Sequence, residues 1–229
     1  MSPDAPPPCA PVPVVWRRSA RARRASLRID ARAGAVVLTL PARAARSTGT
    51  ALLSDHAVWI ADRLAALPPA LAFEDGATLP IGDTPHRIRH VPAGRGGAWL
   101  EGGELLVSGG AEFLSRRVAT FLRAEARRRF AAMALEAGQA AGLRPRRVVV
   151  KDTRTRWGSC TADGTVMLSW RLLLAPEAVQ HYVVAHEVAH LRHMNHGERF
   201  WALVHALTPH RVAAEAWLRT RGAGLQRVG

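Results

Sequence analysis

Apolar positions in the N-terminal half of the chain follow the spacing of strands more often than that of helices. β-Branched and apolar residues run through "VVWRRSARARRASLRIDARAGAVVLTLP" on both sides of a turn at Ala33-Gly34, which predicts an antiparallel hairpin. Short apolar pieces separated by glycines continue from Phe73 to Gly110 and predict a small β layer. Between these regions, apolar residues of "GTALLSDHAVWIADRLAAL" share one helical face, and Pro68-Pro69 ends that predicted helix.

The C-terminal half shows longer helical patterns. Apolar residues at helical spacing predict a long helix from Ala111 to Ala140, with arginines on its exposed face. The segments "RRVVVKD" and "GTVMLSWRL" predict two strands around the loop "TRTRWGSCTAD", in which Asp163-Gly164 is a hairpin-turn signal. Pro176 fits the first turn of a further helix, where proline is tolerated because its missing N–H has no partner there.

These elements predict an α+β protein in three parts. Residues 1–12 are proline-rich and predict a disordered tail, because proline at this density removes backbone donors. Residues 13–110 predict a β-rich region packed on a helical domain, residues 111–229, that carries a short antiparallel sheet. At 229 residues the chain is long enough to bury a substantial core.

Composition narrows the class of protein. No apolar run approaches the roughly 18 residues that a membrane-spanning helix needs, and the first residues lack the basic and apolar stretches of a signal peptide. The two cysteines, Cys9 and Cys160, provide neither a disulfide framework nor a four-cysteine metal site. We therefore expect a cytoplasmic protein without membrane contact.

The charge of the chain leaves a second kind of function open. Lysine and arginine number 32 against 18 acidic residues, which gives a net charge of +14, and Lys151 is the only lysine. Such a charge attracts nucleic acid, and the runs "RRSARARR" and "RRRF" would bind phosphates. Abundant arginine and alanine are also what a compositionally biased genome produces, so both explanations stay open.

Five of the ten histidines lie between His186 and His205, in the apolar segment "VVAHEVAHLRHMNHGERFWALVH". His186 and His190 are four residues apart, so on a helix they lie about 40° apart on one face and can bind a single ion. Glu187 completes the pattern His-Glu-x-x-His and is offset from that face, where it can contact a water on the metal but not bind the metal itself. This spacing is typical of zinc peptidases.

A catalytic zinc usually has three protein ligands and an open position. His196 follows His190 by six residues, so a continuous helix would turn it by about 240° away from the ion. The helix must therefore end between them. Asn195 accepts the left-handed conformation and Gly197 adds freedom, so we expect a turn at Met194-Asn195 that brings His196 back to the metal.

The remaining candidates around the metal are less specific. His193 and His205 are expected to be scaffold or neighbours of the ligands, and Glu215 is an alternative third ligand from a later helix. A metzincin would require glycine at the position of His193 and a methionine further along the chain, and no methionine follows Met194. We therefore exclude that class.

The stretch "DTRTRWGSCTADGTVMLSWRLLLAPEAVQHYVVAHEVAHLRHMNHGERFWALV" closely resembles the YgjP-like predicted metal-dependent hydrolases. The resemblance rests on the Arg-Trp-Gly-Ser-Cys loop, a strand ending in Trp-Arg-Leu, Tyr-Val-Val before His-Glu-x-x-His, and Asn-His followed by Phe-Trp. It is strongest over residues 152–204, and "RARRASLRID" and "GAVVLTLP" extend it over nearly the whole chain.

The resemblance implies a zincin-like, gluzincin-like catalytic domain similar to the SprT-type metalloproteases associated with DNA repair. It implies one Zn2+ ion per chain, bound by His186, His190 and His196, with Glu187 as the catalytic base. We therefore expect a zinc-dependent metallopeptidase acting on peptides or proteins. The alternative is a basic nucleic-acid-associated protein with a structural or vestigial metal site, or a protease of DNA-bound proteins that combines both functions.

Residues outside the metal motif give candidates for substrate binding. The strand "TVMLSW" or its loop is expected to form an edge that pairs with an extended peptide. Arg156 is a candidate to act near the site, although pinning the loop to the helix is an equal alternative. Cys160 is not expected to bind the metal, because a fourth protein ligand would close the site. The tentative substrate-binding or neighbouring residues are Arg156, Trp157, Arg171, Tyr182 and His205.

Overall fold

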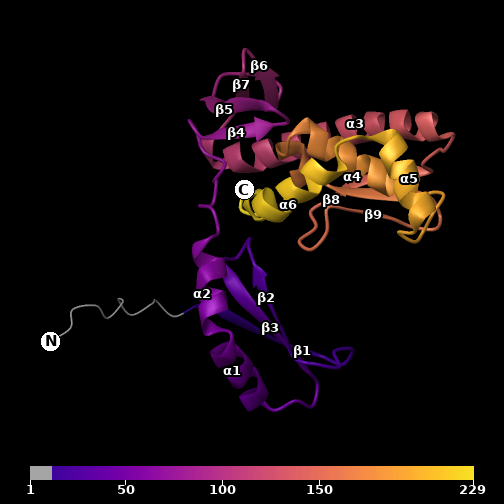
Figure 1. The fold of residues 1–229 in the computed structure, drawn as a ribbon. Coiled ribbons are helices and arrows are strands. Elements are labelled where there is room, and N and C mark those ends of the chain that lie inside the picture. The colour runs from indigo at the N-terminus through magenta and orange to yellow at the C-terminus, as the bar shows by residue number, and fades with distance from the viewer. Residues whose placement is uncertain (1–11) are drawn as a thin grey trace. The chain divides into compact units, whose positions relative to one another are not determined.

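A computed structural model describes residues 12–229, so all of the predicted tail except Val12 lies outside the described residues (Figure 1). The chain divides into two compact units, an N-terminal unit, Met1–Pro69, and a C-terminal unit, Ala70–Gly229. In the described residues, no helix is both long and apolar enough to span a bilayer.

The N-terminal unit contains a three-stranded sheet and two helices. Its elements are β1 (Val14–Ser19), β2 (Ser26–Asp30), β3 (Ala35–Pro41), α1 (Arg46–Asp55) and α2 (Ala57–Ala65). β2 and β3 form the predicted antiparallel hairpin, and Gly34 in its turn has a φ of 59°, which favours glycine. β1 pairs in parallel with β3, a pairing that alternation along the chain does not indicate.

The C-terminal unit begins with a four-stranded sheet in the order β4-β5-β7-β6. The strands are β4 (Thr78–Ile81), β5 (Thr84–Val91), β6 (Ala98–Glu101) and β7 (Glu104–Ser108). They are the predicted β layer between Phe73 and Gly110. The outer pairs are antiparallel and the central pair, β5 and β7, is parallel.

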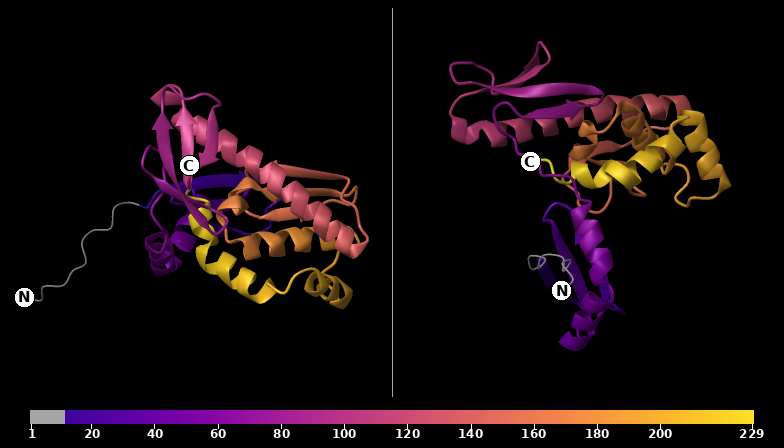
Figure 2. Two further views of the ribbon diagram at one scale, coloured as in Figure 1. Left: turned by 90° about the horizontal axis from the view of Figure 1, so that it is seen from above. Right: turned by 60° about the vertical axis from the view of Figure 1, so that its left-hand side comes forward.

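A long helix connects this sheet to the rest of the C-terminal unit. It comprises a short 3-10 turn, η1 (Ala111–Phe113), and α3 (Leu114–Ala141), close to the predicted bounds. The buried residues of α3 recur every fourth position from Leu114 to Gly138. Each such step turns the buried stripe by about 40°, so it winds around the helix and lets α3 pack against the four-stranded sheet at one end and against α4 and β8 at the other (Figure 2).

The C-terminal part of the chain contains a second small sheet and three helices. Its elements are β8 (Arg147–Lys151), β9 (Gly158–Cys160), β10 (Thr165–Ser169), η2 (Trp170–Leu174), α4 (Glu177–Ala189), α5 (Glu198–Leu207) and α6 (Arg211–Leu225). The predicted antiparallel sheet is mixed: β10 is central, antiparallel to β9 and parallel to β8. The "TVMLSW" strand is therefore not an edge, whereas the loop before it contributes the edge strand β9.

The α+β fold class is confirmed, but the division of the chain differs from the one predicted at residues 110 and 111. The strands β4–β7 share one apolar core with α3, α4 and η2, through residues such as Ile88, Val118 and Leu172. A boundary after residue 110 would cut through this core. The sequence pattern changes there from strand to helix, which suggested a boundary, but the strands and the helix pack into one core.

Candidate metal centre

Helix α4 is the central element around the histidines. It contacts α3, α5, α6, β9 and β10, and nine of its residues are buried. This burial on several sides explains why the segment is apolar almost throughout rather than along one stripe. His186 and Glu187 lie in its last turn, and His190 caps its C-terminal end.

The chain breaks between α4 and α5, as the spacing of the three histidines requires. α4 ends at Ala189, and the turn after it is closed by backbone bonds from Leu191 and Arg192 to the carbonyls of Val188 and Ala189. Asn195 is not left-handed, because no non-glycine residue among those described has a positive φ. The chain bends at Met194 and Asn195, as predicted, but the left-handed conformation expected of Asn195 is wrong.

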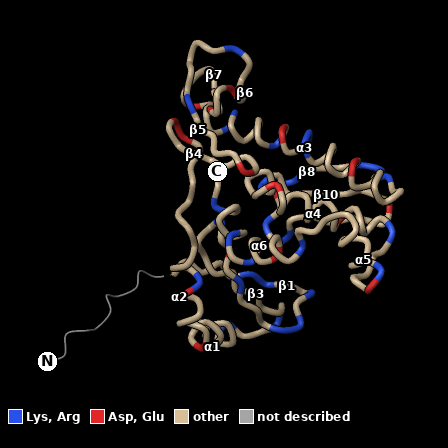
Figure 3. The backbone as a smooth tube through the Cα atoms, turned by 45° about the horizontal axis from the view of Figure 1, so that its top comes forward, with Lys and Arg blue, Asp and Glu red and all other residues tan. Residues whose placement is uncertain are grey.

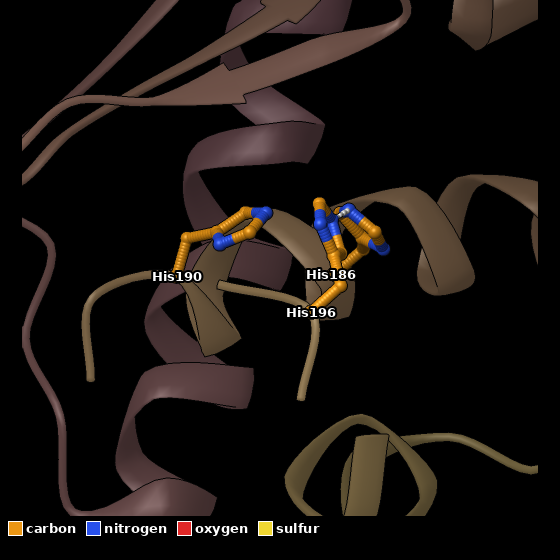
Figure 4. A group of neighbouring side chains, drawn as sticks. All are labelled: His186, His190 and His196. Atoms are coloured by element: carbon orange, nitrogen blue, oxygen red, sulfur yellow. Dashed lines mark hydrogen bonds between the residues drawn. The ribbon is translucent and has the colours of Figure 1, made fainter. Parts of the chain in front are cut away.

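The three predicted ligands come together at this break (Figure 4). Their nitrogen ligand atoms lie within 4.8 Å of one another, and the ring centroids are 5.0 Å apart for His186 and His190 and 4.8 Å apart for His190 and His196. Nε2 of His186 faces Nε2 of His196 at 3.2 Å. Nitrogen atoms from three rings thus meet around one point.

The protonation of these rings fits a metal ion. Burial, together with His190 and His196, lowers the pKa of His186 to about 4, so the ring is neutral and its lone pair is available. Burial also lowers the pKa of His190. Nδ1 of His190 lies 2.9 Å from the carbonyl oxygen of His193, a bond that places the proton on Nδ1 and leaves Nε2 free, as in many metal-binding histidines.

Glu187 lies in a confined space next to His186 in α4. It is 6% exposed, and burial raises the pKa of its carboxyl to about 7, against the opposing charge of Arg156. Gly158 of β9 lies directly over this carboxylate: a Cβ at that position would be 2.5 Å from Oε1 of Glu187. The edge strand therefore passes so close to the carboxylate that no larger residue fits.

Aromatic and charged side chains of α5 and α6 pack around the three imidazoles. Phe200 is buried against all three imidazoles, and Trp201 packs on His186 and His196. The guanidinium of Arg211 lies 3.4 Å from the centre of the Trp201 ring. This stack packs against the ring of His196, which is itself exposed.

Glu215, the alternative ligand, is engaged elsewhere. The hydroxyl of Tyr182 donates to Oε1 of Glu215 at 2.6 Å, and Nε of Arg211 donates to the same oxygen at 3.2 Å. Burial acts to raise the pKa of Glu215, but these two hydrogen bonds outweigh it and lower the pKa. Burial and Glu215 also raise the pKa of Tyr182, whose ring meets His186 edge-on. Tyr182 thus links His186 to Glu215.

Two of the tentative site residues, Arg171 and Trp157, hold other parts of the chain in place. Arg171 is 3% exposed and donates to Asp152 and to the carbonyls of Leu225 and Val228, so it fixes the end of the chain. Trp157 packs on α6, where a Cβ at Gly222 would come within 3.0 Å of its ring. The structure thus gives both side chains anchoring contacts, with Arg171 buried and Trp157 half-buried, where a contact with substrate was expected.

The remaining candidates from the sequence are His205, Arg156 and Cys160. His205 is exposed on α5 and does not belong to the group of three imidazoles, which corrects its tentative place beside the ligands. Arg156 is exposed, and its charge reaches Glu187. Burial, with Glu187 and Asp163, raises the pKa of Cys160 to about 11, so its thiol is protonated and is a poor nucleophile.

Sequence reasoning missed several contributors to this centre. His193 contributes the backbone carbonyl that accepts the hydrogen bond from His190, and a backbone group leaves no signal in the sequence. The "FW" pair after Asn-His supplies Phe200 and Trp201, and its place in the family motif was the available indication. Arg211 stands at a helix start far along the chain and could not be connected to Trp201 without the fold.

Three convergent imidazoles beside a buried carboxylate are typical of metal-dependent hydrolases. The family model described as "YgjP-like, metallopeptidase domain" matches residues 23–221. The chain therefore belongs to the YgjP-like family and is a metallopeptidase, a hydrolase of peptide bonds, as the resemblance predicted.

The metallopeptidase zymogen abylysin of Pyrococcus abyssi is 23% identical over 41% of this chain and 92% of its own length, with a TM-score of 0.36. No curated protein matches the chain.

Proposed function

We propose that this metallopeptidase is zinc-dependent, with His186, His190 and His196 as the ligands and Glu187 as the base. The observation that carries the proposal is the convergence of three imidazole nitrogens within 4.8 Å, next to a buried carboxylate. Three imidazole ligands suit zinc in a catalytic site, since they leave a fourth position open for water or substrate.

Glu187 is the residue that would transfer a proton during hydrolysis. When bound, zinc supplies a Lewis acid that lowers the pKa of water and polarises a carbonyl group. Glu187 accepts a proton from the attacking water and returns it to the leaving amine. A carboxyl whose pKa burial raises to about 7 is suited to both steps, because it binds and releases a proton near neutral pH. Gly158 limits the directions in which this carboxylate can turn.

The substrate would bind as an extended strand along β9. β9 has one neighbour, β10, in the described sheet, and its first residue covers the carboxylate of Glu187. Pairing with an edge strand holds a peptide through its backbone and tolerates many side chains. A peptide bond placed there would lie next to both the imidazoles and the base.

Removal of the metal tests the proposal. Dialysis against a chelator should abolish hydrolysis of an unfolded protein substrate, because the imidazoles alone cannot polarise the scissile carbonyl. Adding one equivalent of Zn2+ should restore it, whereas Mg2+, which prefers oxygen ligands, should not. Activity that survives complete metal removal would refute zinc dependence.

Arg156 is proposed to act on the substrate from the loop before β9. Its guanidinium is exposed and close enough for its charge to affect Glu187, so it can stabilise the negative charge that develops on the substrate oxygen. Arg156→Ala should lower turnover about 10-fold or more while the zinc content and the thermal midpoint stay unchanged. Arg95→Ala, which removes an exposed arginine from another loop, is the control. Equal loss of zinc and stability would make Arg156 structural.

A second candidate function is binding of nucleic acid by the N-terminal unit. Basic residues follow β1 and the turn after it (Figure 3). The exposed ones in this unit include Arg17, Arg21, Arg23, Arg24 and Arg43. If they bind phosphates, affinity for duplex DNA should fall with salt at a log-log slope of about −0.9 per phosphate neutralised. Binding that is absent or insensitive to salt would remove this candidate.

A further inference from the structure

The sheet that carries β9 has a second edge, formed by β8. In the order β8-β10-β9, β8 has one neighbour among the described strands, so its outer backbone groups face away from the sheet. A groove of about 540 Å3 runs along this edge. It is lined by all five residues of β8, from Arg147 to Lys151, and by Arg127 of α3. A groove lined by every residue of a strand follows the strand itself.

The groove is positively charged. Arg127, Arg147 and Lys151 are exposed, and none of them forms a hydrogen bond or ion pair with another described side chain. The acidic residues nearest in sequence are engaged: Asp163 binds Arg146, and Asp152 binds Arg171. Three cations without an internal anion therefore line this groove.

The side chains of β8 alternate between the two faces of the sheet. Val148 and Val150 pack on the apolar core, so Arg147, Val149 and Lys151 lie on the opposite face. A strand paired with β8 would place its own residues opposite these three at every second position. Carboxylates four residues apart would meet Arg147 and Lys151, and a small apolar residue midway would meet Val149.

We propose that the β8 edge binds an extended acidic segment of a partner protein by strand addition. The partner sequence has two acidic residues four positions apart with an apolar residue midway, and a further carboxylate within reach of Arg127. Backbone hydrogen bonds to β8 supply the strand pairing, and the charges fix the register. This surface lies at the other edge of the sheet from Glu187 and does not need the metal, so the inference goes beyond the proposed function.

The test uses the full chain as the Glu187→Gln variant, so that a peptide cannot be cut. A fluorescent peptide with the core Glu-Thr-Val-Thr-Glu, flanked by threonines, is titrated and its anisotropy is measured. Saturable binding is expected, and it should weaken at least about 10-fold in the double variant Arg147→Ala/Lys151→Ala, which loses two charge-assisted contacts. The control double variant Arg63→Ala/Arg95→Ala removes the same charge elsewhere and should bind like the parent. Circular dichroism checks that each variant folds.

Further arms separate strand addition from simple charge attraction. Two further peptides carry methyl groups on every second backbone nitrogen, one on the odd-numbered and one on the even-numbered residues. One of the two should lose binding, because only one of these sets of peptide N–H groups faces β8. In the background with Glu187 intact, the double variant should hydrolyse an unfolded protein at the parent rate, which separates this surface from the active site. The proposal would be overturned if the peptide with the core Lys-Thr-Val-Thr-Lys, or both methylated peptides, bound as tightly as the acidic peptide. It would also be overturned if the double variant bound the acidic peptide as tightly as the parent does. Stronger competition by duplex DNA than by the acidic peptide would overturn it too.

Discussion

Glu187→Gln is expected to retain one metal ion per chain and to lose about 10²- to 10⁴-fold in kcat. The amide has nearly the size of the carboxylate, so it fits under Gly158, but it cannot accept a proton from water. The three imidazoles are untouched, and metal binding should therefore persist. Metal content by mass spectrometry and hydrolysis of an unfolded protein are measured on the same sample.

The matched control for this variant is Glu198→Gln. Glu198 is exposed in the first turn of α5, close in sequence to His196, and it should tolerate the change with full activity. A Glu187→Gln protein that stays fully active would disprove the role of Glu187 as base. One that loses the metal and the fold together would make the carboxylate structural instead.

Gly158→Ala is expected to lower activity and stability through steric overlap alone. The backbone of Gly158 does not have a positive φ, so alanine is not strained there. Its Cβ, however, would lie 2.5 Å from Oε1 and 2.6 Å from Cγ of Glu187, closer than atoms can approach. Either β9 or the base must move, which should cost about 1–3 kcal/mol of stability and most of the activity. Denaturant unfolding and turnover measure the two effects.

Gly197→Ala is the control for that prediction. Gly197 also has a negative φ and lies next to His196, but the nearest atom to an added Cβ is 3.9 Å away. It should keep its stability and activity. If Gly158→Ala behaved in the same way, the close approach of β9 to Glu187 would not hold in solution.

The sequence predicted those parts of the fold that depend on local pattern. The hairpin at Gly34, the helix α3, the strands β8 and β10 and the turn at Gly164 follow from periodicity and turn residues. The edge strand β9 lies in a segment that was predicted as a loop. The parallel pairing of β1 with β3, the central place of β10 and the shared core of β4–β7 with α3 depend on packing between distant segments. Residue patterns do not encode which neighbours a strand will have.

The candidate site divides in a similar way. Spacing alone was sufficient to pick out His186, Glu187 and His190, and the need for a third ligand indicated a break before His196. Trp157 and Arg171 share a motif with Gly158, yet one packs on α6 and the other anchors the C-terminus. A motif marks residues that stay together in a family, and it does not separate those that touch substrate from those that hold the loop.

A crystal structure of the zinc-loaded protein, with anomalous scattering at the zinc edge, tests the central claim most directly. We predict a single strong peak about 2.0–2.1 Å from one ring nitrogen each of His186, His190 and His196, with no fourth protein ligand. Zinc bound by Glu215 in place of His196, or a peak away from these imidazoles, would contradict the claim.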